Sequence, residues 1–460
     1  MKKILSPKRP VVHFIGIGGI GMSSLAQWFM TQNWSVSGSD LIQSEITKEL
    51  RKKGVSIHIG QKSSHVPKHA TLVIRSQAVK SENPEFKEAT QKHIPVLTYP
   101  EIIGSLTKEY KTVAIAGAHG KSTTTALAAL ALIEAKVNPT VIIGTRLKEF
   151  RGNNFRSGTS EWLVLEADEY GKAFLHYTPL LTIITNIDAE HLDTYKNLAG
   201  VKKNFLTFIA RTREGGALIL NKDDKNLVSL KISILNIARE RNLRVVWYSL
   251  KNRVAQAIRK TLQIPGDHNV SNALAVSHLA DVFHIPKSKV LSVFRTYSGS
   301  WRRFEYRGMF HASGLKSDVF DDYAHHPTEI KATLKGFREK FPDRPIICVF
   351  QPHQAERLRR LWPEFERAFN EADITLLLPI YKVAGRDNSS TRYNSHELVR
   401  VIQKKEPKQR IFYIENPKNL KNALKTLCAT LSQKNPALSP VIVMMGAGDI
   451  VNYTEKLLNP

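Results

Sequence analysis

The stretch VAIAGAHGKSTTTALAAL, residues 113–130, decides how the middle of the chain folds. It combines an apolar run, a tight turn bracketed by Gly117 and Gly120, and an alanine-rich helical segment that starts near Lys121. A glycine turn between a strand and a helix points backbone N–H groups at phosphate oxygens. Only two residues separate the glycines, whereas the common phosphate-binding loop has four. The stretch therefore predicts either a shortened ATP loop or a plain structural turn.

The residues after the turn favour the ATP loop. Lys121 can reach the β- and γ-phosphates, and the Ser122 hydroxyl can ligate Mg²⁺. Thr123 adds a further donor at the start of the helix. A purely structural turn has little use for a lysine at this position. We therefore predict ATP binding at this turn.

A second glycine turn, GIGGIG, lies at residues 16–21. Gly16, Gly18 and Gly21 follow an apolar run and satisfy the spacing G-x-G-x-x-G, and Asp40 ends the next strand-like run. This is the fingerprint of a dinucleotide-binding domain, although other diphosphate ligands use the same turn. A tight turn that only packs a helix on a strand is the structural alternative.

Acidic side chains follow two further apolar runs. WLVLEADEY places Glu166, Asp168 and Glu169 at the end of one run. LLTIITNIDAEHLDTY places Asn186, Asp188, Glu190, His191 and Asp193 at the end of another. Ligands bind at the carboxyl ends of the strands in open α/β sheets. Oxygen ligands with one imidazole suit Mg²⁺ better than a structural zinc.

The last third of the chain repeats this arrangement with basic side chains. FDDYAHHPTEI and FQPHQAERLRR place His325, His326, His353 and Arg357 beyond strand-like runs. These residues predict a charged pocket for an anionic substrate, or alternatively helix caps and solvated arginines. From the residues alone both readings stay open.

Apolar runs alternate with helical patterns along the whole chain, which predicts an α/β protein with parallel sheets. The rhythm restarts twice, and we expect domains at residues 1–108, 109–303 and 304–460. Helical patterns in the last domain include PTEIKATLKGFREKF and QAERLRRLWPEFERAF.

Composition limits the class of protein. The 460 residues carry 67 Lys and Arg against 41 Asp and Glu, a formal charge of +26 that favours anionic partners without naming them. The two cysteines, Cys348 and Cys428, lie in apolar or helical patterns, as buried thiols of a reduced compartment do. The N-terminus lacks a signal cleavage site, and no apolar run is long enough to span a bilayer. We expect a cytoplasmic protein with no membrane insertion.

Together the motifs and their order resemble the Mur ligases, the ATP-dependent amide-forming enzymes of peptidoglycan precursor synthesis. The resemblance covers nearly the whole chain. GIGGIGMS resembles the uridine-diphosphate loop of that family, GAHGKSTTT its shortened ATP loop, and EADE and TNIDAEHLD its metal-binding strand ends. DHNVSNALA, WRRFE, DDYAHHPTE and FQPH resemble its later signatures. The first glycine turn is thereby reassigned from NAD to UDP.

The resemblance implies a Rossmann-like UDP-binding domain, a central P-loop-type ATPase domain with a mainly parallel sheet, and a C-terminal Rossmann-like domain. It implies that ATP phosphorylates the lactyl carboxylate of UDP-N-acetylmuramate and that the amine of L-alanine attacks the acyl phosphate. ATP and two Mg²⁺ ions are the implied cofactors. The partners are then small molecules rather than nucleic acid, and the protein is expected to be a monomer or a homodimer.

The resemblance also implies roles for individual residues. Catalysis is expected from Lys121, Glu166 and His191, and Mg²⁺ binding from Ser122, Glu166 and His191. ATP binding is expected from Gly117, His119, Gly120, Lys121, Ser122, Thr123, His268, Asn272, Arg303 and Asp322. UDP-sugar binding is expected from Gly16, Gly18, Gly19, Ile20, Gly21, Ser39 and Asp40. Amino acid binding is expected from Tyr323, His325, His353 and Arg357.

Two departures from the pattern keep alternatives open. Tyr170 and Gly171 stand where alanine-adding members usually have Ser-Asp, and a Glu-Ala-Asp-Glu-Tyr run also occurs in the related ligase that recycles a muropeptide. Gln354 stands where alanine-adding members commonly have Arg. From other classes, a dinucleotide-dependent oxidoreductase would use the first glycine turn, and a nucleic-acid-associated ATPase would use the basic charge. We expect L-alanine to be the preferred amino acid.

Overall fold

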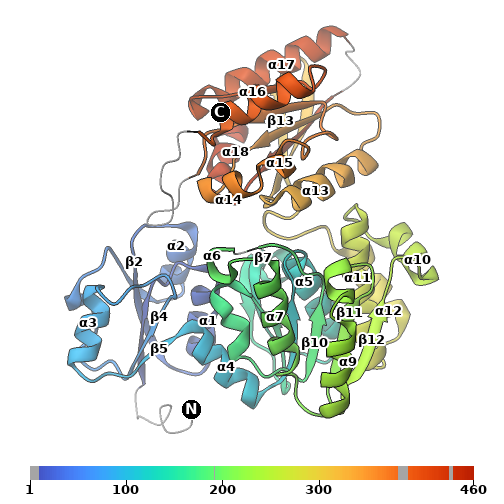
Figure 1. The fold of residues 1–460 in the computed structure, drawn as a ribbon. Helices are drawn as coiled ribbons and strands as arrows, with labels where there is room; N and C mark the ends of the chain where they lie inside the picture. The colour runs from blue at the N-terminus through green and yellow to red at the C-terminus, as the bar shows by residue number, and fades with distance from the viewer. Residues whose placement is uncertain (1–9, 191, 382–391, 435–438, 460) are drawn as a thin grey trace. The chain divides into compact units, whose positions relative to one another are not determined.

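The computed structural model describes residues 10–190, 192–381, 392–434 and 439–459, without the side chains at 192, 193, 432 and 434. Helices cover three separate sheets in this part of the chain, which forms three α/β domains (Figure 1). The chain divides into two compact units, Met1–Thr261 with Ser271–Arg295 and Leu262–Val270 with Thr296–Pro460. The first unit holds the first two sheets. The predicted fold class is confirmed.

The N-terminal sheet has five parallel strands in the order β3-β2-β1-β4-β5. The strands are β1 (Val11–Ile15), β2 (Ser35–Asp40), β3 (Ser56–Ile59), β4 (Leu72–Arg75) and β5 (Val96–Thr98). The helices are α1 (Ile20–Thr31), α2 (Glu45–Lys52), α3 (Pro84–Gln91) and α4 (Tyr99–Glu109). The strand order reverses at β1, because β2 lies on one side of it and β4 on the other. Open α/β sheets bind ligands at such a switch point, and the first glycine turn joins β1 to α1 there.

The central sheet has seven strands in the order β12-β11-β10-β6-β9-β7-β8. They are β6 (Lys111–Ala116), β7 (Thr140–Leu147), β8 (Asn153–Arg156), β9 (Trp162–Glu166), β10 (Leu181–Ile184), β11 (Ala217–Asn221) and β12 (Arg244–Tyr248). All pairs are parallel except β7 with β8. Helix α5 (Lys121–Glu134) starts at the second glycine turn and is buried along most of its length. Small alanine side chains let it pack closely on the sheet.

The C-terminal sheet has six strands in the order β13-β14-β18-β15-β16-β17. They are β13 (Glu305–Ala312), β14 (Leu315–Asp322), β15 (Ile346–Phe350), β16 (Ile374–Leu377), β17 (Ile411–Tyr413) and β18 (Val441–Met445). Only the edge strand β13 is antiparallel to its neighbour among these described strands. The sheet therefore places the ends of β14, β18 and β15 side by side.

The remaining helices connect these strands along the chain. Those between β10 and β13 are α6 (Leu192–Tyr195), α7 (Leu198–Ile209), α8 (Lys225–Val228), α9 (Lys231–Glu240), α10 (Arg253–Thr261), α11 (Asp267–Val282) and α12 (Lys287–Thr296). Those that follow β14 are α13 (Pro327–Lys340), α14 (Ala355–Arg360), α15 (Trp362–Phe365), α16 (Ser395–Lys405), α17 (Leu420–Lys434) and α18 (Ile450–Leu458). Within the described ranges, no helix combines the length and the apolar character needed to cross a bilayer.

The structure differs from the sequence reading in three elements. The edge strands β8 and β13 were not expected, because NNFR and EYRGMFHA lack the apolar alternation of a typical strand. The pattern QAERLRRLWPEFERAF forms two short helices, α14 and α15, rather than one. Pro363 explains the break, because proline has no N–H and disfavours a helical residue before it.

In the first compact unit, one apolar cluster contains buried residues of both sheets. Phe14 and Phe29 of the N-terminal domain belong to the same buried cluster as Phe174 and Phe205 of the central domain. The C-terminal sheet has a separate core. Because the two sheets share this cluster, both glycine turns belong to the same compact unit.

Candidate active site

The second glycine turn lies where three parallel strands end together. Strand β6 leads into the turn and pairs with β10 on one side and β9 on the other. Because the pairs are parallel, Glu166 at the end of β9 and Asn186 just after β10 reach the edge of the sheet at which the turn lies. The sheet topology thus brings together the three motifs that the sequence placed at strand ends.

Both glycines of this turn are required by the backbone and by space. Gly117 has φ 144° and Gly120 has φ 81°, in the region that side chains other than glycine rarely adopt. A Cβ on Gly117 would lie 2.0 Å from Thr185 Oγ1, and one on Gly120 would lie 2.4 Å from Asn272 Oδ1. Asn272 on α11 therefore lies directly beside the turn, as expected of an ATP-site residue.

Lys121 points back into the turn. Its Nζ donates hydrogen bonds to the carbonyl oxygens of Gly117, at 2.7 Å, and Ala118, at 3.2 Å. The same ammonium forms an ion pair of 2.9 Å with Glu169 Oε2. Burial opposes the charge of Lys121, but the carboxylates of Glu169, Asp168 and Glu166 outweigh it and raise the pKa of Lys121. The turn therefore holds a largely shielded ammonium whose nearest charged partner is Glu169.

Ser122 and Glu166 form a pair of hard oxygen donors next to this ammonium. Ser122 Oγ donates to Glu166 Oε1 at 2.9 Å, and the Gly144 N–H donates to Glu166 Oε2 at 2.7 Å. Burial raises the pKa of Glu166. A hydroxyl and a carboxylate that converge beside a phosphate loop fit the ligand preference of Mg²⁺. The other expected ligand, His191, lies outside the described residues.

The end of β10 shapes the turn from the other side. The His119 N–H donates to Asn186 Oδ1 at 2.8 Å, and Asn186 Nδ2 donates to the His119 carbonyl at 2.9 Å. The His119 ring lies 2.9 Å from Asp188 Oδ2. Asn186 and Asp188 thus contact the loop itself, a role that the sequence reading did not distinguish from metal binding. Thr123 is buried in the first turn of α5.

The first glycine turn is held by the end of β2. The N–H groups of Gly16 and Ile17 donate to the Ser39 carbonyl at 2.9 and 3.0 Å. The Gly18 N–H donates to Asp40 Oδ2 at 2.8 Å, and a Cβ on Gly18 would meet the same oxygen at 2.8 Å. Most of the expected UDP-sugar residues therefore belong to one compact loop.

Helix α1 begins at Ile20, directly after its N-cap residue Gly19. The first N–H groups of a helix lack partners within the helix and attract anions. No acidic side chain lies in the first turn of α1 itself, and the Asp40 carboxylate bonds to the Gly18 N–H before the helix begins. The backbone around Ile20 and Gly21 is thus suited to a diphosphate. The Ser39 hydroxyl is buried and donates to Glu85 Oε2 at 2.7 Å.

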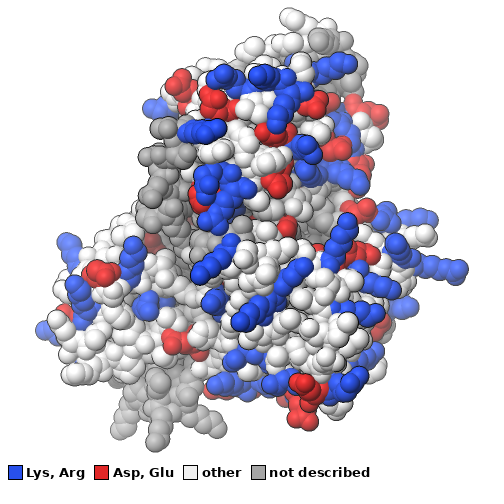
Figure 2. Space-filling model, in the orientation of Figure 1, with Lys and Arg blue, Asp and Glu red and all other residues white. Residues whose placement is uncertain are grey.

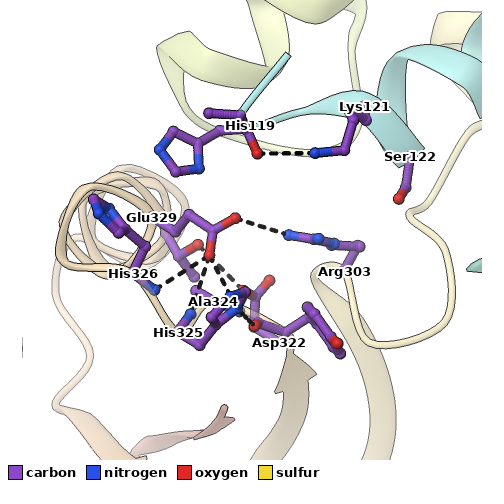
Figure 3. Close-up of polar contacts among 12 residues, drawn as sticks. His119, Lys121, Ser122, Arg303, Asp322, Ala324, His325, His326 and Glu329 are labelled. Atoms are coloured by element: carbon purple, nitrogen blue, oxygen red, sulfur yellow. Dashed lines mark hydrogen bonds and ion pairs between the residues drawn. The ribbon is translucent and has the colours of Figure 1, made fainter. Parts of the chain in front are cut away.

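In the second compact unit, Glu329 organises the start of α13 (Figure 3). Its Oε2 accepts hydrogen bonds from the N–H groups of His325, at 3.1 Å, and His326, at 3.3 Å. Its Oε1 lies 3.6 Å from Arg303 Nη1. The sequence reading missed Glu329. The signal was present in His-Pro-Thr-Glu, residues 326–329, because a Glu three residues after an N-cap residue completes a capping box.

Asp322 is buried at the end of β14. Its oxygens accept from the N–H groups of Phe304 and Ala324, both at 2.9 Å, and from Thr333 Oγ1 at 3.3 Å. Burial raises the pKa of Asp322. The carboxylate fixes the backbone next to Arg303, and its contact with ATP stays a prediction.

The four expected amino acid ligands lie close together. The Tyr323 and His325 rings are 5.3 Å apart, and the His325 and His353 rings are 6.0 Å apart. Arg357 Nη1 lies 3.4 Å from His353 Nδ1. These side chains follow β14 and β15, the two strands that flank β18 in the sheet. They form a basic and aromatic cluster suited to a small carboxylate.

The residues that flank this cluster have defined positions. Gln354 adopts φ 70°, a conformation that is rare outside glycine, and its N–H donates to the Tyr381 carbonyl at 3.2 Å. The Arg303 guanidinium lies 5.0 Å from the centre of the Tyr323 ring. His268 lies beside Gly266, where an added Cβ would be 2.6 Å from the histidine ring.

Comparisons with known proteins cover the whole chain. Three family profiles match it: "Mur ligase family, catalytic domain" at residues 11–111, "Mur ligase middle domain" at 115–280, and "Mur ligase, glutamate ligase domain" at 302–448. A UDP-N-acetylmuramate–L-alanine ligase of Sulfurihydrogenibium sp. is 36% identical, with 97% of this chain and 96% of that protein covered. A protein of the same name from Clostridium botulinum is 35% identical, with 99% of each chain covered.

Solved structures agree in fold. The UDP-N-acetylmuramate-alanine ligase of Thermotoga maritima superposes with a TM-score of 0.75 at 26% identity, over 97% of this chain and 98% of that chain. A murein peptide ligase of Psychrobacter arcticus shares the fold, with a TM-score of 0.68 at 21% identity, over 98% of both chains. Matched along its full length by the three family profiles and by these relatives, the chain belongs to the Mur ligase family.

Proposed function

We propose that this protein joins L-alanine to the lactyl carboxylate of UDP-N-acetylmuramate and converts ATP to ADP and phosphate. The observation that carries the proposal is the full-length similarity to proteins named UDP-N-acetylmuramate–L-alanine ligase. The buried Lys121 in a loop shaped for phosphates supports it independently.

The chemistry follows from the reactivity of the substrates. A carboxylate does not react with an amine at neutral pH, so the lactyl carboxylate first takes the γ-phosphoryl group of ATP. The amine of L-alanine then attacks the carbonyl carbon of the acyl phosphate, the C–O bond to phosphate breaks, and the amine loses a proton. Lys121 neutralises charge on the transferred phosphoryl group, which is the main task of protein side chains in this class of reaction.

Mg²⁺ completes this site in the proposal. Ser122 and Glu166 hold one ion, and Glu166 with His191 holds a second. Bound Mg²⁺ neutralises phosphate charge and orients the triphosphate. The hydrogen-bonded oxygens of Ser122 and Glu166 support the first ion. The second ion rests on the family resemblance alone, because His191 lies outside the described residues.

The three substrates are assigned to the three domains. UDP-N-acetylmuramate binds residues 1–108 through the first glycine turn, ATP binds 109–303, and L-alanine binds 304–460. Tyr323, His325, His353 and Arg357 surround the amino acid, and the free amides at the start of α1 take the diphosphate. The clustering of these side chains at the ends of β14 and β15 supports the last assignment. A monomer or homodimer and a cytoplasmic location stay predictions.

The basic charge does not favour a nucleic-acid ATPase. On the face shown in Figure 2, Lys and Arg are spread over the described parts of both units with Asp and Glu among them. Nucleic-acid sites gather basic residues into a patch or stripe instead. ATP, the UDP-sugar, the lactyl carboxylate and the amino acid carboxylate are all anionic. These small-molecule substrates are sufficient to explain why a cationic protein is favourable, without nucleic acid.

The test is phosphate release from ATP with UDP-N-acetylmuramate, measured with each of the twenty amino acids and with the tripeptide L-Ala-γ-D-Glu-meso-diaminopimelate. We expect release with L-alanine, and weaker release with Gly and L-Ser, because one methyl group changes binding by only ~1–3 kcal/mol. Release with the tripeptide but not with L-alanine would identify a recycling ligase instead.

A further inference from the structure

A buried carboxylate is linked to the first glycine turn through Ser39. Glu85, in the first turn of α3, and His13, in β1, have no exposed surface. Glu85 Oε2 lies 2.8 Å from His13 Nε2 and accepts a hydrogen bond from Ser39 Oγ at 2.7 Å. Acidic side chains are almost never fully buried unless they are paired. The partners His13 and Ser39 are therefore what allows an acidic side chain to lie fully buried at this position.

The other contacts of this network stay inside the N-terminal domain. His13 Nδ1 lies 2.9 Å from Ser37 Oγ, and His65 Nδ1 lies 3.7 Å from Glu85 Oε1. The network therefore ties α3 to β1 and β2. The chemical step proposed above uses none of these side chains, so the network calls for a different explanation.

Ser39 connects the network to the glycine turn. Its carbonyl accepts the N–H groups of Gly16 and Ile17, and the next residue, Asp40, accepts the N–H group of Gly18. Two successive residues at the end of β2 thus hold three successive N–H groups of the turn. The side chain of Ser39 is itself held by Glu85, so this carboxylate fixes the residue whose carbonyl shapes the turn.

We infer that Glu85, paired with His13, is a positioning residue for the diphosphate loop of the UDP-sugar site. Glu85 holds the Ser39 hydroxyl, and this fixes the position of the Ser39 carbonyl. The carbonyl in turn holds the glycine turn, and the turn sets the direction of the N–H groups at the start of α1. A hydrogen bond to an ionised acceptor is roughly twice as strong as a neutral one, which is the advantage of a carboxylate at this position. The inference rests on the proposed UDP-sugar site.

The experiment compares the full-length protein with Ser39→Ala, Glu85→Gln and Ser37→Ala. Calorimetry measures the Kd of UDP-N-acetylmuramate without ATP, and steady-state kinetics measures KM for each substrate. Ser39→Ala removes the link and should raise Kd about tenfold, which corresponds to ~1.4 kcal/mol. Glu85→Gln keeps an acceptor and should raise Kd several-fold. Both variants should leave the KM for ATP close to wild type, because neither residue belongs to the ATP loop.

Ser37→Ala is the matched control. Ser37 lies on the same strand, and its hydroxyl contacts His13 rather than the residue that holds the loop. This variant should bind UDP-N-acetylmuramate as wild type does, while thermal unfolding shows whether all three variants fold. Wild-type Kd in Glu85→Gln, or a loss in Ser37→Ala equal to that in Ser39→Ala, would overturn the inference. If the wild-type protein itself fails to bind the UDP-sugar, the proposed function fails first.

Discussion

The Lys121 ammonium and the Glu169 carboxylate lie 2.9 Å apart in an almost fully buried ion pair at the phosphate loop. An anion that enters the loop must compete with Glu169 and with the Gly117 carbonyl for the same ammonium. The Lys121 side chain is therefore held in one orientation before ATP binds. Phosphate oxygens of ATP then replace the Gly117 carbonyl and the Glu169 carboxylate as its partners.

Replacing Lys121 with Ala should reduce kcat by about a hundredfold or more, because an electrostatic stabiliser of the transferred phosphoryl group is lost. The glycines build the turn, so the fold should survive. Phosphate-release assays measure the rate, and circular dichroism checks the fold. Near-normal ligation by a folded variant would show that this turn is not the ATP site.

Replacing Glu169 with Gln should lower the thermal midpoint without ligand and enlarge the increase that ATP produces. The variant leaves the buried Lys121 ammonium without its nearest counter-charge, and breaking a buried pair is destabilising by up to ~3–5 kcal/mol. In the variant, the phosphates of ATP supply the negative charge that Lys121 has lost. ATP therefore stabilises the variant more than it stabilises wild type. Thermal shift with and without ATP measures both values. An ATP-induced shift equal to that of wild type would contradict the competition between Glu169 and phosphate.

Replacing Ser122 with Ala should raise the Mg²⁺ concentration needed for half-maximal rate several-fold, because one of two converging oxygen donors is removed. Titrating Mg²⁺ against rate measures the change. Thr124→Ala is the control, since the Thr124 hydroxyl donates to the carbonyl of the N-cap residue Gly120 and not to Glu166. The same Mg²⁺ requirement in Ser122→Ala and in wild type would remove Ser122 from the metal site.

Replacing Arg357 with Ala should raise KM for L-alanine about tenfold, because a charge-assisted bond to its carboxylate contributes ~1.5–3 kcal/mol. The KM values for ATP and UDP-N-acetylmuramate should not change. Arg360→Ala is the matched control: Arg360 belongs to the same helix but pairs with Glu356 at 2.7 Å. A specific effect of Arg357→Ala on ATP rather than on L-alanine would place this arginine in another site.

The sequence was sufficient to predict the parts of the site that are local. Gly117, Lys121 and Ser122 follow one another along the chain, and Glu166 directly ends an apolar run, so periodicity and chemistry identify them together. Parallel pairing of β6, β9 and β10 then brings these positions to one edge of the sheet. The alternation of strands and helices likewise predicts the three parallel sheets.

The contacts that the sequence could not predict are long-range or polar. Glu85 lies 46 residues from Ser39, and nothing local to either residue indicates that they meet. The edge strand β8 contains the buried polar residue Asn154, so its periodicity did not separate it from a loop. These features depend on tertiary packing, which overrides local pattern.

A last prediction concerns Asp321, which is buried in β14 beside the candidate ATP residue Asp322. Burial raises the pKa of Asp321 to about 7, even though Thr454 Oγ1 donates to it and Arg307 lies 3.2 Å away. Its ordinary value is 3.8, so between these two pH values the folded protein binds more protons than the unfolded chain. The contribution of this group to the free energy of unfolding therefore falls as the pH rises through that window.

Asp321→Asn removes this titration and keeps an oxygen that can accept from Thr454. The variant should gain stability relative to wild type as the pH rises from about 5 to about 8, by an amount on the order of 3 kcal/mol. Urea unfolding of both proteins at the two pH values measures that difference directly, and comparing them cancels the titration of all other groups. A stability difference that is the same at both pH values would show that Asp321 is already ionised in the folded protein. In that case the Arg307 guanidinium, rather than burial, would dominate the electrostatics at the end of β14.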